Sequence, residues 1–157
     1  MKINEEVVAL LRQKHLKIAT AESCTGGLLA KLITDVAGAS EVFDYGIVSY
    51  ANEIKRGQLG VQRETLERFG AVSEQTAREM AQCAAKNGGA DIGLSTTGIA
   101  GPTGGTPEKP NGTCFAGLHY QGKTKVLKIS TGLSDREQNR TAFAQRALEL
   151  VKEEINE

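Results

Sequence analysis

Hydrophobic periods typical of helices alternate with short strand-like runs along this chain, and that alternation constrains the fold more than any other feature. Val7, Val8 and Leu11 form the apolar stripe of a first helix, and a short strand follows it. Strands are expected at 17–21, 43–50, 91–97, 114–120 and 125–130. The main expected helices are 4–14, 28–36, a helix that Ser73 caps and a last helix that begins at Ser134. The pattern predicts an α/β domain.

Length and charge balance exclude several classes of protein. The chain has 157 residues, a length that suits a single domain, 1–157, with its own core. Its 19 Lys and Arg equal its 19 Asp and Glu, whereas affinity for a polynucleotide needs a basic surplus. There is no apolar run of about 18 residues and no signal-peptide core near the start. We therefore expect a cytoplasmic protein with no nucleic-acid or membrane partner.

Few residues are suited to bind a metal. Cys24, Cys83 and Cys114 show no C-x-x-C spacing, and His15 and His119 are the only histidines. A zinc site and a disulfide framework are therefore not expected, nor is any cofactor.

The shortage of histidine directs the search for a catalytic base toward lysine. His15 is expected to end the first helix and His119 to lie within a strand, so neither has an evident catalytic partner. Lys55 follows the second expected strand. A lone lysine is usually a solvated charge, but burial near Arg136 would lower the pKa of Lys55 and make it a general base.

Two Gly-rich segments follow expected strands. Segment 23–27 lies where a strand leads into a helix, and its backbone N–H groups are placed to bind an anion, or its residues simply cap the helix. Segment 101–112 contains all three prolines, and it is either a binding loop or a long surface connection. Because ligands of open α/β sheets bind beyond the carboxyl ends of strands, residues 22–27 and 97–101 are expected to border one crevice.

The start of the last expected helix breaks the amphipathic pattern. Ser134 and Glu137 match a capping box. Arg136 and Arg140 point in nearly the same direction as Ala147 on the apolar stripe. Their guanidinium groups form either structural salt bridges or a binding site for an anionic ligand.

Segment 117–124 matches the P-loop pattern G-x-x-x-x-G-K-[ST]. A P-loop connects a strand to a helix, whereas this segment lies between two expected strands. We therefore interpret 117–124 as part of a hairpin.

Several ordered blocks together resemble the carboxyl-terminal domain of the CinA competence/damage-inducible family, whose stand-alone form is a nicotinamide mononucleotide amidohydrolase. The blocks are 20–27 (TAESCTGG), 37–40 (AGAS), 49–55 (SYANEIK), 70–73 (GAVS), 97–102 (TGIAGP), 104–105 (GG), 108–110 (EKP) and 112–113 (GT). The resemblance extends over essentially the whole chain. It implies a three-layer α/β/α domain with a mixed, mostly parallel five-stranded sheet, assembled as a homo-oligomer.

The resemblance also implies an activity and a set of site residues. The activity is hydrolysis of the carboxamide of nicotinamide mononucleotide to nicotinate mononucleotide and ammonia. The matching functional positions here are Ser23, Ser40, Tyr50, Lys55, Thr97 and Arg136. The family's Gly-Ser-Ser block reads Gly-Ala-Ser at 38–40, which keeps the second serine.

Amide hydrolysis through an acyl-enzyme needs a nucleophile, a base and oxyanion donors. We expect Lys55 to activate a serine, with Ser40 slightly preferred over Ser23, and Arg136 to bind substrate or tune Lys55. Thr97 and the backbone near Gly98 are expected to hold the oxyanion. The phosphate is expected to contact Gly26, Gly27 or Arg140. Tyr50 is expected to stack on the pyridinium ring.

Two alternatives are compatible with the same residues. One is a non-catalytic module of the competence and DNA-damage response that senses nucleotides or binds a partner. The other is an amidase for a different small carboxamide, because no residue in the blocks reads a nicotinamide ring specifically.

Overall fold

The computed structural model describes residues 1–156 and contains one five-stranded sheet with helices on both faces. The strands are β1 (Ile18–Glu22), β2 (Phe43–Val48), β3 (Ile92–Ile99), β4 (Thr113–Tyr120) and β5 (Lys123–Ser130). The helices are α1 (Ile3–Lys14), α2 (Leu28–Thr34), α3 (Asn52–Ile54), α4 (Arg63–Phe69), α5 (Glu74–Gly88) and α6 (Arg136–Ile155). A short 3₁₀ turn, η1 (Ala39–Glu41), precedes β2, and a π-helical turn, η2 (Lys55–Leu59), follows α3.

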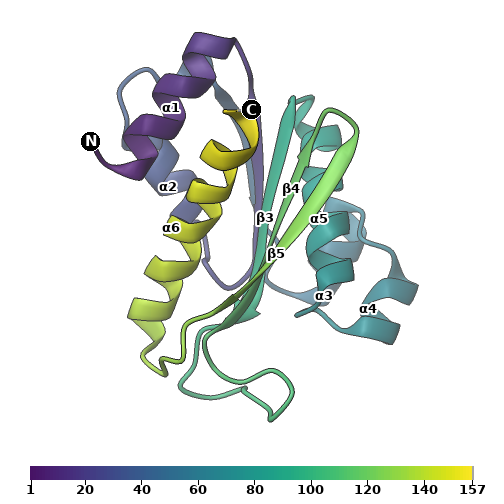
Figure 1. Ribbon diagram of the computed structural model, residues 1–157. Helices are drawn as coiled ribbons and strands as arrows, with labels where there is room; N and C mark the ends of the chain where they lie inside the picture. Colours follow the sequence, from purple (N-terminus) through teal and green to yellow (C-terminus); the bar gives the residue numbers. More distant parts are fainter. Residues whose placement is uncertain (157) are drawn as a thin grey trace.

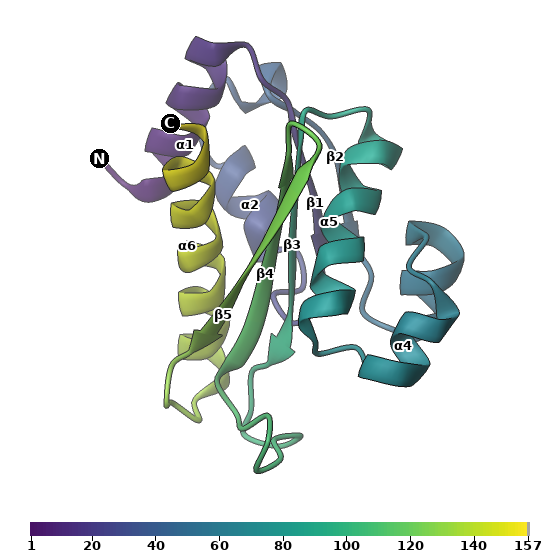
Figure 2. The ribbon, with the colours of Figure 1, turned by 45° about the vertical axis from the view of Figure 1, so that its right-hand side comes forward.

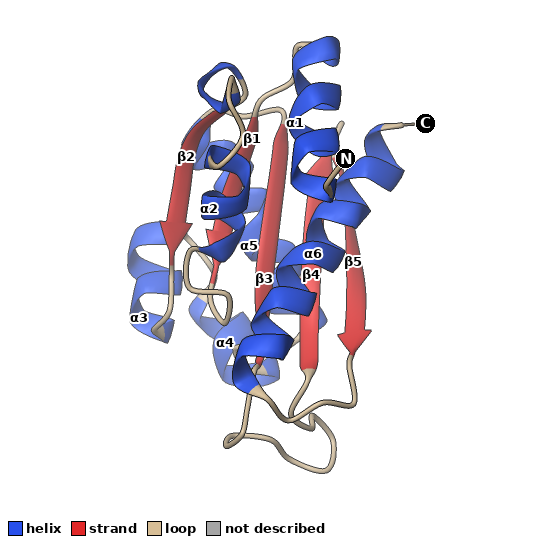
Figure 3. Cartoon of the chain, turned by 90° about the vertical axis from the view of Figure 1, so that its left-hand side faces the viewer, coloured by secondary structure: helices blue, strands red, loops and turns tan. Residues whose placement is uncertain are grey.

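The strand order is β2-β1-β3-β4-β5 (Figure 3). β1 pairs in parallel with both β2 and β3, whereas β4 pairs antiparallel with both β3 and β5, so β4 alone runs against the other four strands. The predicted α/β class and the mixed, mostly parallel sheet are confirmed. Segment 117–124 forms the β4–β5 hairpin, which confirms that its P-loop pattern is coincidental.

The helices form two layers around the sheet. α1, α2 and α6 cover one face, and α3, α4 and α5 cover the other (Figures 1 and 2). α5 packs very close to the sheet, because β3 and β4 carry glycines beneath it. A Cβ atom at Gly93 would lie 1.9 Å from the Ala81 carbonyl oxygen, and one at Gly117 would lie 2.5 Å from that of Ala77.

The main core lies between the sheet and the layer of α1, α2 and α6. Val7, Val8 and Leu11 are buried there, as the periodicity of the first helix predicts. Phe143 and Leu148 of α6 are also fully buried. At about 25 cal/mol for each Å² of apolar surface, burial of this kind is the main source of stability.

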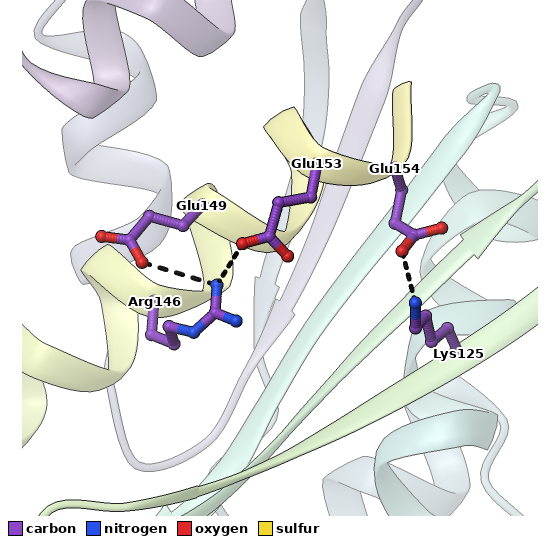
Figure 4. Close-up of polar contacts among 5 residues, drawn as sticks. All are labelled: Lys125, Arg146, Glu149, Glu153 and Glu154. Atoms are coloured by element: carbon purple, nitrogen blue, oxygen red, sulfur yellow. Dashed lines mark hydrogen bonds and ion pairs between the residues drawn. The ribbon is translucent and has the colours of Figure 1, made fainter. Parts of the chain in front are cut away.

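Ion pairs also form along α6 and between α6 and β5. Arg146 bridges Glu149 and Glu153 along the helix, and Lys125 of β5 binds Glu154 (Figure 4). Exposed pairs of this kind each contribute at most about 1 kcal/mol.

Helix caps agree with the sequence prediction in one case and differ in another. The Ser73 side chain accepts a hydrogen bond from the Thr76 backbone N–H, as predicted for α5. The cap of α6 is Asp135 rather than Ser134, and its carboxylate accepts a bond from the Gln138 N–H. The aspartate supplies a stronger, charged acceptor than the predicted serine.

Among residues 1–156, no helix combines the length and the apolar character needed to span a bilayer.

Candidate active site

A cavity of about 260 Å³ lies at the carboxyl ends of β1, β2 and β3, where the sequence analysis placed a crevice. Its wall comes from segments far apart in the chain: the β1–α2 bend, the β2–α3 connection, residues 71–72, the end of β3 and the start of α6. Its lining residues are Ser23, Cys24, Tyr50, Lys55, Ala71, Val72, Thr97, Gly98, Ile99, Ala100, Thr103 and Arg136.

Ser23 and Lys55 form a hydrogen-bonded pair in this cavity. The Lys55 Nζ donates to Ser23 Oγ over 2.9 Å. Parallel pairing explains the contact: β1 and β2 end side by side, with Glu22 in register with Val48, so the residues after each strand emerge together. The π-helical turn then begins at Lys55, and irregular turns of this type are frequent at functional sites.

The Lys55 ammonium is buried and has no carboxylate partner among residues 1–156. The side chain is only 1% exposed, and its Nζ also donates to the backbone carbonyls of Ser49 at 2.7 Å and Tyr50 at 2.9 Å. Burial lowers the pKa of Lys55 to about 8, and the neighbouring Cys24 opposes part of that shift. The pair therefore combines a hydroxyl with an amine that loses its proton near neutral pH.

The structure does not bring Ser40 and Lys55 together within this chain, in contrast to the Ser40–Lys55 pair that the sequence analysis preferred. Ser40 lies in η1, exposed, just before β2 begins, whereas Lys55 follows the end of β2. The six residues of β2 alone span roughly 17 Å. The serine that reaches Lys55 is Ser23.

The start of α2 is already occupied by a carboxylate. Glu22 is 1% exposed, and it accepts hydrogen bonds from the backbone N–H groups of Gly27, Leu29 and Ala30. The Gly26 N–H donates to the Ser23 carbonyl. The expectation that Gly26 and Gly27 hold a phosphate is therefore wrong, because their N–H groups are used and a negative charge lies beside them.

Arg140 supports the bend rather than lining the cavity. Its Nε donates to the Cys24 carbonyl at 3.2 Å, and its Nη2 donates to that of Thr25 at 2.9 Å. A Cβ at Gly26 would lie 2.9 Å from this guanidinium, so glycine gives the arginine room. The sequence analysis expected Arg140 to contact the phosphate or to form a structural salt bridge. In the structure its guanidinium instead donates to two backbone carbonyls of the bend.

Arg136 and Tyr50 meet at the edge of the cavity. Arg136 Nη2 donates to the Tyr50 hydroxyl at 3.1 Å, and Nη1 donates to the Gly101 carbonyl at 2.9 Å. Tyr50 is 59% exposed, so one part of its ring remains accessible. The arginine thus links the β2–α3 connection to the loop after β3 and keeps further donors for a ligand.

Thr97 and Gly98 form the floor of the cavity. The Thr97 hydroxyl donates to the Ala71 carbonyl at 2.7 Å, so its proton is not free for an oxyanion and its oxygen acts as an acceptor. A Cβ at Gly98 would lie 2.5 Å from the Thr113 carbonyl oxygen, so this glycine lets β4 approach closely.

Sequence reasoning missed Glu22 and Lys109. Glu22 precedes a helix, a position that favours acidic residues, but only the structure shows its burial. Lys109 ties the 101–112 loop to the cavity wall, because its Nζ donates to the carbonyls of Phe69 and Val72. Its position in the only proline-rich segment was the available signal.

Comparison with known proteins agrees with this architecture. Residues 1–155 match the model of the CinA C-terminal domain. The chain belongs to the CinA C-terminal domain family. The resemblance that the sequence blocks indicated is therefore confirmed.

Relatives of this CinA C-terminal domain include proteins of known structure. A competence/damage inducible protein CihA from Agrobacterium tumefaciens is 40% identical with a TM-score of 0.94, over 99% of this chain and 94% of that one. A CinA superfamily protein from Klebsiella pneumoniae is 31% identical with a TM-score of 0.94, over 98% and 96%. The five-stranded α/β fold is thus shared with the CinA superfamily.

Longer relatives share only one region with this CinA domain. A CinA-like protein from Kosmotoga olearia is 57% identical over 150 residues, which are 96% of this chain and 36% of that protein. The chain therefore spans about a third of the length of such curated relatives.

Proposed function

We propose that this CinA domain hydrolyses the carboxamide of nicotinamide mononucleotide to nicotinate mononucleotide and ammonia. The observation that carries the proposal is the 2.9 Å contact between Ser23 Oγ and the buried Lys55 Nζ. A Ser–Lys pair supplies the nucleophile and the base of an amidase without histidine or metal. The membership of the CinA family supports the choice of substrate class.

Acylation begins with neutral Lys55. Its Nζ takes the proton of Ser23, and Oγ attacks the carboxamide carbon. The resulting oxyanion is held by the backbone N–H of Cys24, which has no protein acceptor among residues 1–156. A backbone N–H directly after a nucleophile is used in the same way by other hydrolases.

Lys55 then returns the proton. The protonated amine donates it to the departing nitrogen, and ammonia leaves an acyl-enzyme on Ser23. Neutral Lys55 next takes a proton from water, whose oxygen attacks the acyl carbon. The protonated amine returns that proton to Ser23 Oγ as the acyl–oxygen bond breaks, and the product leaves as its carboxylate after losing its acid proton to solvent. Each proton is thus carried by one amine, which must change its charge in each half-reaction.

The charges around the cavity favour an anionic substrate. Four cationic side chains around the cavity donate to backbone carbonyls, and within residues 1–156 none of them has an ion-pair partner. They are Lys55, Lys109, Arg136 and Arg140. Their positive charge is therefore not neutralised locally. We assign the phosphate to Arg136 at the edge of the cavity and the pyridinium ring to the exposed face of Tyr50.

Ammonia release from a panel of carboxamides tests the proposal. Purified protein is expected to release ammonia from nicotinamide mononucleotide faster than from nicotinamide or nicotinamide riboside, which lack the phosphate. Lys55→Met is expected to be inactive and excludes a contaminating amidase. Binding of the nucleotide without turnover would instead favour a non-catalytic sensing module, and turnover of another carboxamide alone would favour a different amidase.

A further inference from the structure

Cys24 and Cys114 are two free thiols in direct contact, although 90 residues separate them in sequence. Their sulfur atoms lie 4.0 Å apart. Both belong to a small buried cluster with Ala100 and Phe143, on the α6 side of the sheet. Gly98 lies next to Cys114 in the β3–β4 ladder, and a Cβ there would lie 2.8 Å from that of Cys114.

The two thiols differ in access. Cys24 lines the cavity and is 6% exposed, whereas Cys114 is fully buried. Burial, and then the contact with Cys24, raise the pKa of Cys114 well above its usual value, so Cys114 remains a thiol. A small oxidant in the cavity therefore meets Cys24 first.

We propose that Cys24 and Cys114 are a reversible modification site, which a peroxide converts into a disulfide. The Cys24 thiolate attacks one peroxide oxygen and breaks the O–O bond, which gives a sulfenic acid and one molecule of water or alcohol. The Cys114 sulfur then attacks the Cys24 sulfur, the S–S bond forms, and hydroxide leaves with the Cys114 proton as water. In total the two thiols lose two hydrogens and the peroxide is reduced.

Bond formation has to move Cys24 rather than Cys114. A disulfide has sulfur atoms about 2.05 Å apart, so the contact must shorten by roughly 2 Å. Cys114 lies within β4, which pairs with β3 on one side and β5 on the other. Cys24 lies in the bend between β1 and α2, outside regular secondary structure. Formation of the disulfide therefore moves the β1–α2 bend, with Cys24, toward Cys114.

Displacement of Cys24 also displaces Ser23, which precedes it and contacts Lys55. A misplacement of about 1 Å at a reacting group can lower the rate roughly 100-fold. We expect oxidation to inactivate the enzyme until a thiol reductant restores the pair. This consequence for activity rests on the proposed function, whereas formation of the disulfide does not.

Hydrogen peroxide treatment of the full chain tests the site. Wild type is expected to fall from three free thiols to one, and to yield a peptide that links Cys24 to Cys114. Dithiothreitol is expected to restore all three thiols. Cys83→Ser is the control, because Cys83 lies on α5 across the sheet, and it is expected to form the same linked peptide.

Other results would overturn the proposal. Oxidation of Cys83 while Cys24 stays reduced, or a linkage that includes Cys83, would do so. Cys114→Ala is expected to give a Cys24 sulfenic acid that dimedone traps, and no linked peptide. If the disulfide forms while ammonia release is unchanged, the coupling to Ser23 is wrong. If wild type releases no ammonia at all, the proposed function fails but the thiol count still tests the disulfide.

Discussion

Lys55 Nζ donates a hydrogen bond to Ser23 Oγ over 2.9 Å, and the two residues are 32 positions apart in sequence. The contact depends on two parallel strands that end together, β1 before Ser23 and β2 before Lys55. Of the two candidate serines it involves only Ser23, and under the proposed function the pair supplies both the nucleophile and the base. It also has consequences for activity, for pH dependence and for stability.

Replacement of each serine by alanine separates the two candidates. We expect Ser23→Ala to lose ammonia release by about 10³-fold or more, because the acyl-enzyme needs its oxygen. Ser40→Ala is expected to stay near wild type, since Ser40 is exposed at the opposite end of β2. Steady-state kinetics with both variants decide the assignment, and the reverse pattern would restore Ser40.

The pH dependence of the rate reports the protonation of Lys55. Only neutral Lys55 accepts the Ser23 proton, and with a pKa of about 8 roughly one molecule in ten is neutral at pH 7. We expect kcat/KM to rise about tenfold per pH unit below pH 8 and to level off above it. A rate that is flat between pH 6 and pH 9 would argue against lysine as the base.

Lys55 also makes stability depend on pH. Folding lowers its pKa from 10.5 to about 8, so between these values the unfolded chain binds the proton and the folded chain does not. Stability from this group therefore rises with pH across that window. Relative to Lys55→Met, wild type should gain on the order of 3 kcal/mol between pH 7 and pH 11. Urea unfolding of both proteins measures the difference, and an unchanged difference would contradict it.

Glu22 stabilises the bend that carries Ser23. Glu22→Gln removes the charge from an acceptor of three backbone N–H groups and of the Thr25 hydroxyl. We expect a loss of about 1–3 kcal/mol in the free energy of unfolding. The exposed Glu64, in the first turn of α4, provides the matched control Glu64→Gln, which should cost much less. Equal effects of the two substitutions would show that the buried carboxylate has no special role.

Lys109 fixes one wall of the cavity through the Phe69 and Val72 carbonyls. We expect Lys109→Met to raise KM several-fold and to increase proteolysis within 101–112, because the loop loses its tether. Lys123→Met, at an exposed position in the β4–β5 hairpin, should change neither. Kinetics and limited proteolysis check both variants, and a wild-type KM with an intact loop would contradict a positioning role.

The layered fold was accessible from local patterns. Helices and strands repeat their apolar residues at characteristic spacings, and Ser73 caps α5 as its position predicted. The choice between Ser23 and Ser40 as the partner of Lys55 within one chain also follows from the strand pattern. Two parallel strands of one sheet bring their carboxyl ends together, which places Ser23 beside Lys55 and leaves Ser40 at the far end.

By itself the sequence determined the alternation of helices and strands, the edge of the sheet where the candidate site lies, and the prediction of a lysine base in a chain with two histidines. The tertiary structure alone decided that Glu22 fills the start of α2, that Arg140 holds carbonyls rather than phosphate, and that Cys24 touches Cys114. The reason is physical: periodicity is set by neighbours along the chain. The partners of a buried charge or thiol are instead set by atoms that only the packed sheet and helices bring within a few ångströms.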